Sequence, residues 1–330
     1  MAAIALRSPQ YKSATAGTGA NSAQLTISID GTIEYTLVKS TTAGATMLWE
    51  ISELCRDFLN ITYGGSYTAQ TLAIICTLTS HASTDGTGTA LTTLTVTDVG
   101  YDGYGTYEQG SNPTIPFSNR PRWLLNTNPE SLDVYYIYVP NNTAGVLPYI
   151  AVDASMGYAG YGASQTSISA SSNYGQYLVN IVRVDCTKYG DGNRITFVNK
   201  FGALQDIWFF LKSVNTTNKK QEQYQRNTIS SSGGYNVSEH TKQVFNTVAN
   251  TSLTLSSGFY PEWANQWFEQ LLLSEQVWLT RLNPSNPNAT EYIPLNVKKS
   301  SMVKKTVLND KLIEYTFEFD MSYDYINNVR

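Results

Sequence analysis

Alternation of apolar and polar residues over strand-length segments restricts the fold of this chain more than any other sequence feature. The alternation is clearest in residues 24–29 and 33–39, which flank Asp30-Gly31. Two alternating segments around an Asp-Gly step predict a β-hairpin with a two-residue turn. Similar alternation at 177–213 and 277–319 predicts antiparallel strands, each with one face in a core.

The composition also favours a β protein. The 330 residues include 23 Tyr but only 22 Lys and Arg and 26 Asp and Glu, so 15% of the chain is charged and its net charge is −4. An average domain has about 25% charged residues. A charge-poor, net-acidic chain lacks the basic field that nucleic-acid binding requires, so we predict no nucleic-acid partner.

We therefore predict a mainly β protein with two antiparallel β-sandwich-like domains, each carrying one helix. The predicted parts are a flexible N-terminal arm at 1–23, a β-rich domain at 24–182 and a second at 183–330. The arm has little apolar area of its own with which to offset the entropy of ordering. The helices are placed at 46–59, where apolar residues recur at spacings of three and four, and at 261–273. Further strands are expected at 71–79, 90–99, 123–125, 132–139, 146–152, 243–255 and 302–308, and 215–234 is expected to be a polar connection.

Candidate catalytic groups are sparse. The only histidines are His81 and His240. His81 lies in a loop segment, Ser80 to Asp85, that contains the three residue types of a Ser–His–Asp triad, but such groups normally converge from separate elements. Asp98, Asp102 and Glu108 are the candidates for a carboxylate pair, and nothing in their spacing selects two of them. We predict a protein that is not an enzyme.

The sequence indicates no bound cofactor, metal or membrane span. Cys55, Cys76 and Cys186 form no CxxC pair and are expected to be buried as reduced thiols. No phosphate-binding glycine motif is present. The first 17 residues lack the apolar core of a signal peptide, and no apolar run is long enough to span a bilayer, so we expect synthesis in a cytoplasm.

Aromatic residues in two Gly- and Ser-rich segments, 101–119 and 153–174, are the candidates for partner contacts. Tyr in such a setting provides rigid, amphipathic contact area at a small entropic cost. The alternative is that these tyrosines cap the ends of the sheets within their own chain. Together with two tryptophans of the second predicted helix, the interface candidates are Tyr101, Tyr104, Tyr107, Tyr158, Tyr161, Trp263 and Trp267.

Parts of the second half resemble structural proteins of tailed-bacteriophage virions. The resemblance lies in VDCTKY at 184–189, ITFVNKFGALQDIWFF at 195–210, LNDKLIEYTFEFD at 308–320 and INNVR at 326–330, and more loosely in WEISELCRD at 49–57. It implies a virion component but no functional residues.

The resulting hypothesis is a non-enzymatic structural subunit of a phage tail, in its tip, baseplate or neck. Such a subunit would reside in the virion and bind copies of itself and neighbouring virion proteins. The alternative is an adhesin or fibre-attachment module of the virion that binds a host receptor or a host-surface glycan.

Overall fold

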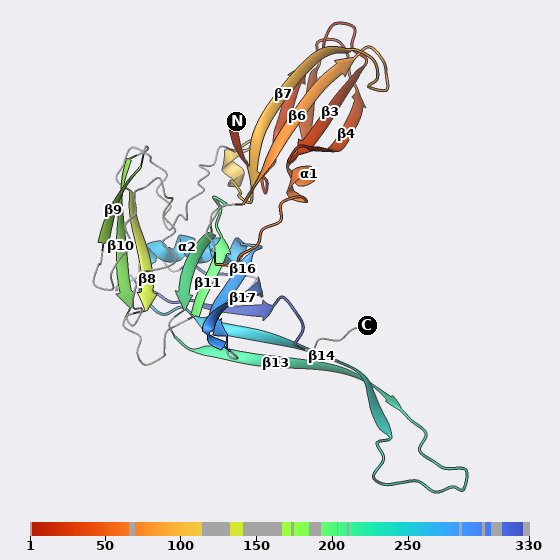
Figure 1. Cartoon of the computed structure of the whole chain (residues 1–330), viewed down its shortest axis with the longest axis vertical. Helices are drawn as coiled ribbons and strands as arrows, with labels where there is room; N and C mark the ends of the chain where they lie inside the picture. Colours follow the sequence, from red (N-terminus) through yellow and green to blue (C-terminus); the bar gives the residue numbers. More distant parts are fainter. Residues whose placement is uncertain are drawn as a thin grey trace. The chain divides into compact units, whose positions relative to one another are not determined.

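A computed structural model describes residues 2–65, 70–113, 133–140, 167–172, 175–184, 193–202, 204–209, 211–283, 286–298, 301–304 and 312–325. The protein is mainly β, with 54% of residues in strands and 9% helical, which confirms the predicted class. The chain divides into two compact units (Figure 1). Unit 1 comprises residues 1–185 and 196–207, and unit 2 comprises 186–195 and 208–330.

The main sheet of unit 1 has five strands in the order β1-β7-β6-β3-β4. These are β1 (Ala2–Ala5), β7 (Ala90–Tyr101), β6 (Thr71–His81), β3 (Ser22–Ile29) and β4 (Thr32–Ser40). The predicted hairpin between β3 and β4 is confirmed, because Asp30 and Gly31 both have positive φ, 49° and 91°. β1 pairs in parallel with β7, which differs from the predicted all-antiparallel pairing.

A second sheet of two strands shares one core with the first. β2 (Tyr11–Thr15) pairs with β5 (Thr46–Glu50). Met47 and Trp49 of β5 lie in the same buried cluster as Leu25 and Ile27 of β3 and Ile74 of β6. Alternate residues are buried along β3 and β6, as the alternation of apolar and polar residues in the sequence predicted.

Two predictions for this region were wrong. Residues 1–23 are not a separate flexible arm, because β1 and β2 lie in the sheets of unit 1. Their backbone groups pair with β7 and β5. The apolar side chains of the segment are also buried in the core cluster of unit 1; these are Ile4, Leu6, Ala16, Ala20 and Ala23. The helix predicted at 46–59 begins only at residue 52, since β5 occupies 46–50 and α1 spans Ser52–Arg56.

A separate sheet of three strands has the order β8-β10-β9. Its strands are β8 (Asp133–Pro140), β9 (Ser167–Ser172) and β10 (Gly175–Val184), and β10 runs parallel to β8. The strands predicted at 123–125 and 146–152 lie outside the described residues. Of the strand predicted at 302–308, residues 302–304 are described, and they are not in a strand.

Seven strands form the second large sheet, in the order β12-β11-β16-β17-β19-β14-β13. They are β11 (Asn193–Val198), β12 (Leu204–Phe209), β13 (Ser213–Gln225), β14 (Lys242–Ser256), β16 (Val277–Asn283), β17 (Asn286–Val297) and β19 (Thr316–Met321). β15 (Tyr260–Pro261) pairs separately with β18 (Leu312–Ile313). The polar connection predicted at 215–234 was wrong for its first half, because β13 extends to residue 225.

Aromatic rings fill the core of unit 2. The second predicted helix is present as a 3-10 turn, η4 (Glu262–Ala264), followed by α2 (Asn265–Leu273). Phe268 of α2 is fully buried, and its ring centroid lies 6.3 Å from that of Phe209 and 6.0 Å from that of Phe317. Tyr260 and Tyr315 pack against the same ring at 5.3 and 5.1 Å. These contacts attach α2 to the sheet.

Candidate protein-binding surface

Tyr101 anchors the end of β7 inside unit 1. Its side chain is fully buried in a small cluster with Ala5 and Phe201. A Cβ atom on either Gly103 or Gly202 would overlap its ring, so glycine at both positions makes room for it. Burial raises the pKa of the Tyr101 hydroxyl well above its usual value. The ring therefore leaves no surface for a partner.

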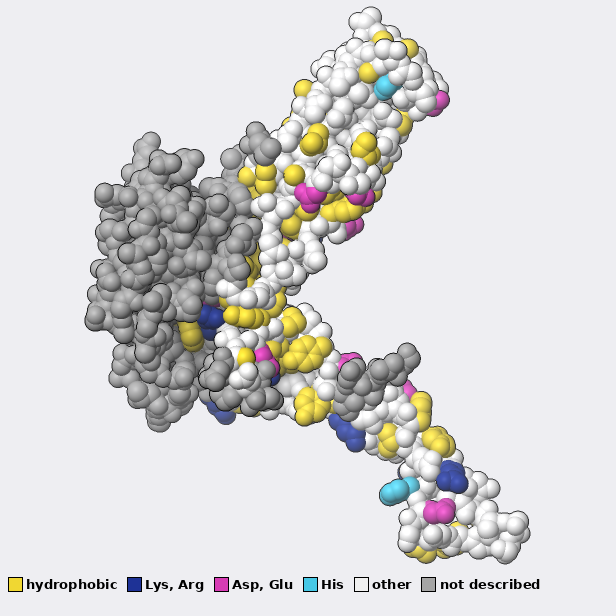
Figure 2. All heavy atoms as spheres, in the orientation of Figure 1, with side chains coloured by type: hydrophobic (Ala, Val, Ile, Leu, Met, Phe, Trp, Pro, Cys, Tyr) yellow, Lys and Arg dark blue, Asp and Glu magenta, His cyan; other side chains and the backbone are white. Residues whose placement is uncertain are grey.

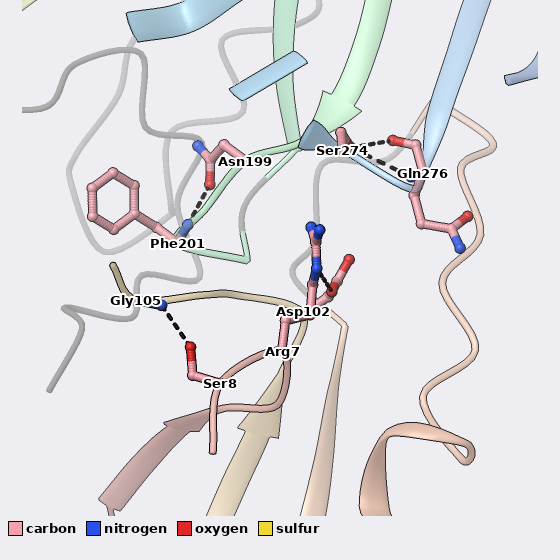
Figure 3. A network of polar contacts seen from close by, with 8 residues as sticks. All are labelled: Arg7, Ser8, Asp102, Gly105, Asn199, Phe201, Ser274 and Gln276. Atoms are coloured by element: carbon pink, nitrogen blue, oxygen red, sulfur yellow. Dashed lines mark hydrogen bonds and ion pairs between the residues drawn. The ribbon is translucent and has the colours of Figure 1, made fainter. Parts of the chain in front are cut away.

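Tyr104 and Tyr107 follow at spacings of three but lie in different surroundings. Tyr104 is half-buried under the guanidinium of Arg7, which lies 4.9 Å from the ring centroid. Arg7 also approaches Asp102, with 3.9 Å between Nε and Oδ1 (Figure 3). Tyr107 begins the 3-10 helix η1 (Tyr107–Gln109), and its side chain is 98% exposed. Of these three tyrosines, only Tyr107 offers its full ring to a partner.

Of the other interface candidates, Trp267 alone has a described side chain. Trp267 is buried in α2. Trp263 lies in η4, but its side chain is outside the described residues. Tyr158 and Tyr161 also lie outside them.

The three residue types of the candidate triad do not converge. His81 is the last residue of β6 and is buried, with Nε2 2.9 Å from the hydroxyl of Thr79. The Asp85 carboxylate accepts hydrogen bonds from the backbone and side chain of Thr87 instead. These bonds lower the pKa of Asp85, as expected for a residue that stabilises a turn. Ser80 shares a 2.6 Å hydrogen bond with Thr92.

The candidate carboxylates also have separate roles. Asp98 is buried and forms an ion pair with Lys12, at 2.5 Å between Oδ2 and Nζ. Asp102 lies beside Arg7, as described above, and Glu108 is exposed in the first turn of η1. Among the described residues, no group of three His, Cys, Asp or Glu side chains could hold a metal ion, and no helix is long and apolar enough to cross a membrane.

Among the described residues, the hairpin of β13 and β14, residues 213–256, which we call the ribbon, pairs with the rest of its sheet only through residues 252–256 of β14, which lie beside β19. Figure 1 shows the two strands continuing past the other strands of their sheet into a long loop. All 13 residues of β13 are exposed, and β13 is an edge strand. At its base the ribbon is fixed by Leu253 and Leu255, which are buried, and by Ser252, whose hydroxyl donates to Asp320 at 2.6 Å.

Exposed hydrophobic side chains gather at the far end of the ribbon, residues 224–245, which we call the ribbon tip. A bulge between Glu222 and Gln223 shifts the register there. The ring centroids of Tyr224 and Phe245 are 6.3 Å apart, and the Tyr224 hydroxyl donates to Gln243 at 2.6 Å. The exposed large hydrophobic residues of the tip are Tyr224, Ile229, Tyr235, Val237, Val244 and Phe245.

Sequence reasoning missed the ribbon because β13 is polar on both faces and so shows no alternation of period two. The usable signal was indirect. Residues 243–255 alternate for 13 positions, which is longer than a strand needs to cross one core, and a long strand requires a partner of similar length.

Comparison of the chain with protein-family models, with curated proteins and with solved structures found no significant match.

Proposed function

We propose that the chain is a non-enzymatic structural subunit of a phage tail, in its tip, baseplate or neck, which binds copies of itself and neighbouring virion proteins. The observation that carries this proposal is the ribbon. The virion setting rests on the sequence resemblance at 184–210 and 308–330.

The ribbon supports an assembly role because its exposed edge strand and apolar side chains are unfavourable in water. A two-stranded hairpin is marginally stable by itself, and an exposed edge strand offers unpaired backbone groups to other chains. In the ribbon tip, Phe245 is 66% exposed and Val237 is 88% exposed. Exposed apolar side chains that lie together are typical of protein-interaction surfaces. A neighbouring subunit would cover these groups and complete the edge.

The direct test shortens the ribbon. Residues 223–245 are replaced by Asn-Gly, which joins the paired residues Glu222 and Asn246 through a two-residue turn. A matched control shortens the β6–β7 loop of unit 1, replacing residues 82–89 by Asn-Gly between the paired residues His81 and Ala90. Each variant replaces the wild-type gene in the infecting phage, and far-UV circular dichroism of the purified chains checks that both fold.

The proposal predicts that the short-ribbon variant folds but is missing from particles, or that assembly stops before it, whereas the control enters particles as the wild type does. Complete particles that contain the short-ribbon chain but do not attach to cells would favour the adhesin alternative. Complete, attaching particles would contradict both roles for the ribbon. Hydrolysis of a host-surface glycan by the wild-type chain would contradict the non-enzymatic part.

A further inference from the structure

We propose that the ribbon tip docks on a second copy of this chain, at an acidic aromatic surface beside α1 of unit 1. This inference rests on the proposed function, because it names the partner of the ribbon. The ribbon tip supplies basic and aromatic groups, and the α1 surface supplies acidic and aromatic ones.

The ribbon tip presents two rings next to basic side chains. Tyr224 is 48% exposed and packs against Phe245. Arg226 lies two residues beyond Tyr224, and Lys242 is opposite Gln225 in the register, so both cations flank the ring pair. Lys242 and Arg226 are exposed. Figure 2 shows basic and hydrophobic side chains together on the ribbon.

The receiving surface, which we call the α1 patch, also contains a pair of aromatic rings, but acidic side chains lie beside them. It consists of Tyr35, Glu53, Asp57 and Phe58. The rings of Tyr35 and Phe58 meet edge to face at 5.9 Å between centroids. Asp57 is the sequence neighbour of Phe58, and Glu53 lies four residues before Asp57; both acids are exposed, whereas Arg56, the basic residue of α1, is half-buried. Figure 2 shows acidic side chains gathered among hydrophobic ones where α1 lies.

The charge balance favours a copy of this chain as the occupant. Within the ribbon, four Lys and Arg residues stand against two Glu residues, giving a net charge of +2. Since the whole chain has a net charge of −4, the remainder carries −6. A basic projection on an acidic body is electrostatically complementary to other copies of itself, and such complementarity steers encounter and fixes register.

The contact would be heterologous, because the ribbon tip and the α1 patch are different surfaces. Each copy then offers one donor surface and one acceptor surface. Contacts of this type generate rings when the rotation closes and filaments when it does not. In many interfaces, a few aromatic residues at the buried centre, surrounded by charged residues, contribute most of the binding energy. The two aromatic pairs would take this central position here.

The test uses charge reversal in the full-length chain. The ribbon variant is Arg226→Glu with Lys242→Glu, and the patch variant is Glu53→Lys with Asp57→Lys. Controls are Lys212→Glu and Asp324→Lys, exposed charges outside both surfaces. Thermal unfolding verifies folding. Sedimentation velocity then measures association of each chain, and of the two reversed variants mixed, in about 0.05 M and about 0.5 M salt, where screening differs strongly.

We expect the wild type and both controls to associate, and to do so more weakly at high salt. Each reversed variant should associate on the order of 100-fold more weakly, since like charges are then juxtaposed. The mixture of the two should regain association, because the unchanged ribbon of the patch variant matches the unchanged patch of the ribbon variant, and the two reversed surfaces match each other.

A wild-type chain that stays monomeric at about 100 µM, or a mixture that regains nothing, would overturn this inference. If the monomeric chain nevertheless requires its ribbon to enter particles, the proposed function stands and the ribbon binds another virion protein. If the ribbon is dispensable in particles as well, both proposals fail.

Discussion

Two substitutions of the same residue type in unit 2 separate folding from assembly. Phe268 is fully buried, and four aromatic rings lie within 6.3 Å of its own. Removing a buried Phe side chain costs about 3–5 kcal/mol, and the aromatic contacts place Phe268→Ala in the upper half of that range, at about 4 kcal/mol. Phe245 is 66% exposed, so only about a third of its transfer free energy, roughly 1 kcal/mol, is at risk in Phe245→Ala.

The assay is equilibrium urea unfolding of the purified chain, followed by tryptophan fluorescence. Four of the six tryptophans, Trp208, Trp263, Trp267 and Trp278, belong to unit 2, so its transition dominates the signal. We expect a large loss of unfolding free energy for Phe268→Ala and a small one for Phe245→Ala. Equal losses of about 3 kcal/mol or more would refute this expectation, because Phe245 would then be part of the folded core rather than a surface kept for a partner.

Three further predictions concern unit 1. Lys12→Met leaves the buried Asp98 carboxylate without its partner and should cost about 3 kcal/mol or more in urea unfolding, with part of the loss recovered when Asp98→Leu is added. Gly31→Val forces a β-branched residue into φ of 91° and should lower unfolding free energy by about 1–2 kcal/mol, whereas Gly31→Asn should cost less. Burial raises the pKa of Cys55 to about 12 and that of Cys76 to about 11. At pH 8 a thiol reagent should therefore leave both cysteines unlabelled in the folded chain and label them in urea, as peptide mass spectrometry would show. Labelling before unfolding would contradict their burial.

The parts of the fold that could be predicted are those that a short, continuous stretch of sequence determines by itself. Asp30-Gly31 with its alternating flanks gave the β3–β4 hairpin, because turn chemistry and strand period are both local. The α2 segment was also found close to its observed bounds, since its apolar face runs through a continuous stretch of chain.

The errors arose where a partner distant in sequence decides the structure. Met47 and Leu48 suited a helical spacing, but pairing with β2 makes residues 46–50 a strand in which alternate residues are buried. Likewise, β1 is ordered through β7, about ninety-six residues away in the register. Tertiary pairing overrides local propensity in such cases.

Candidate sites were harder to predict than strands. Tyr101, Tyr104 and Tyr107 have equal spacing, but the first ends a strand, the second lies under Arg7 and the third begins a 3-10 turn. Spacing in a loop therefore did not translate into a shared surface. The ribbon has no such pattern in β13, and its exposed tip became visible only when β13 and β14 were paired.

Hydrogen exchange reports whether a neighbouring subunit covers the ribbon tip in the assembled state. Backbone amides of residues 224–245 would be compared between the dilute, unassembled chain and purified particles, with the β6–β7 loop, residues 82–89, as an internal reference. If the ribbon tip binds a neighbouring subunit, its exchange should slow by about 100-fold or more on assembly, because its amides become buried and hydrogen-bonded. Ribbon-tip amides that exchange equally fast in both states would contradict such binding.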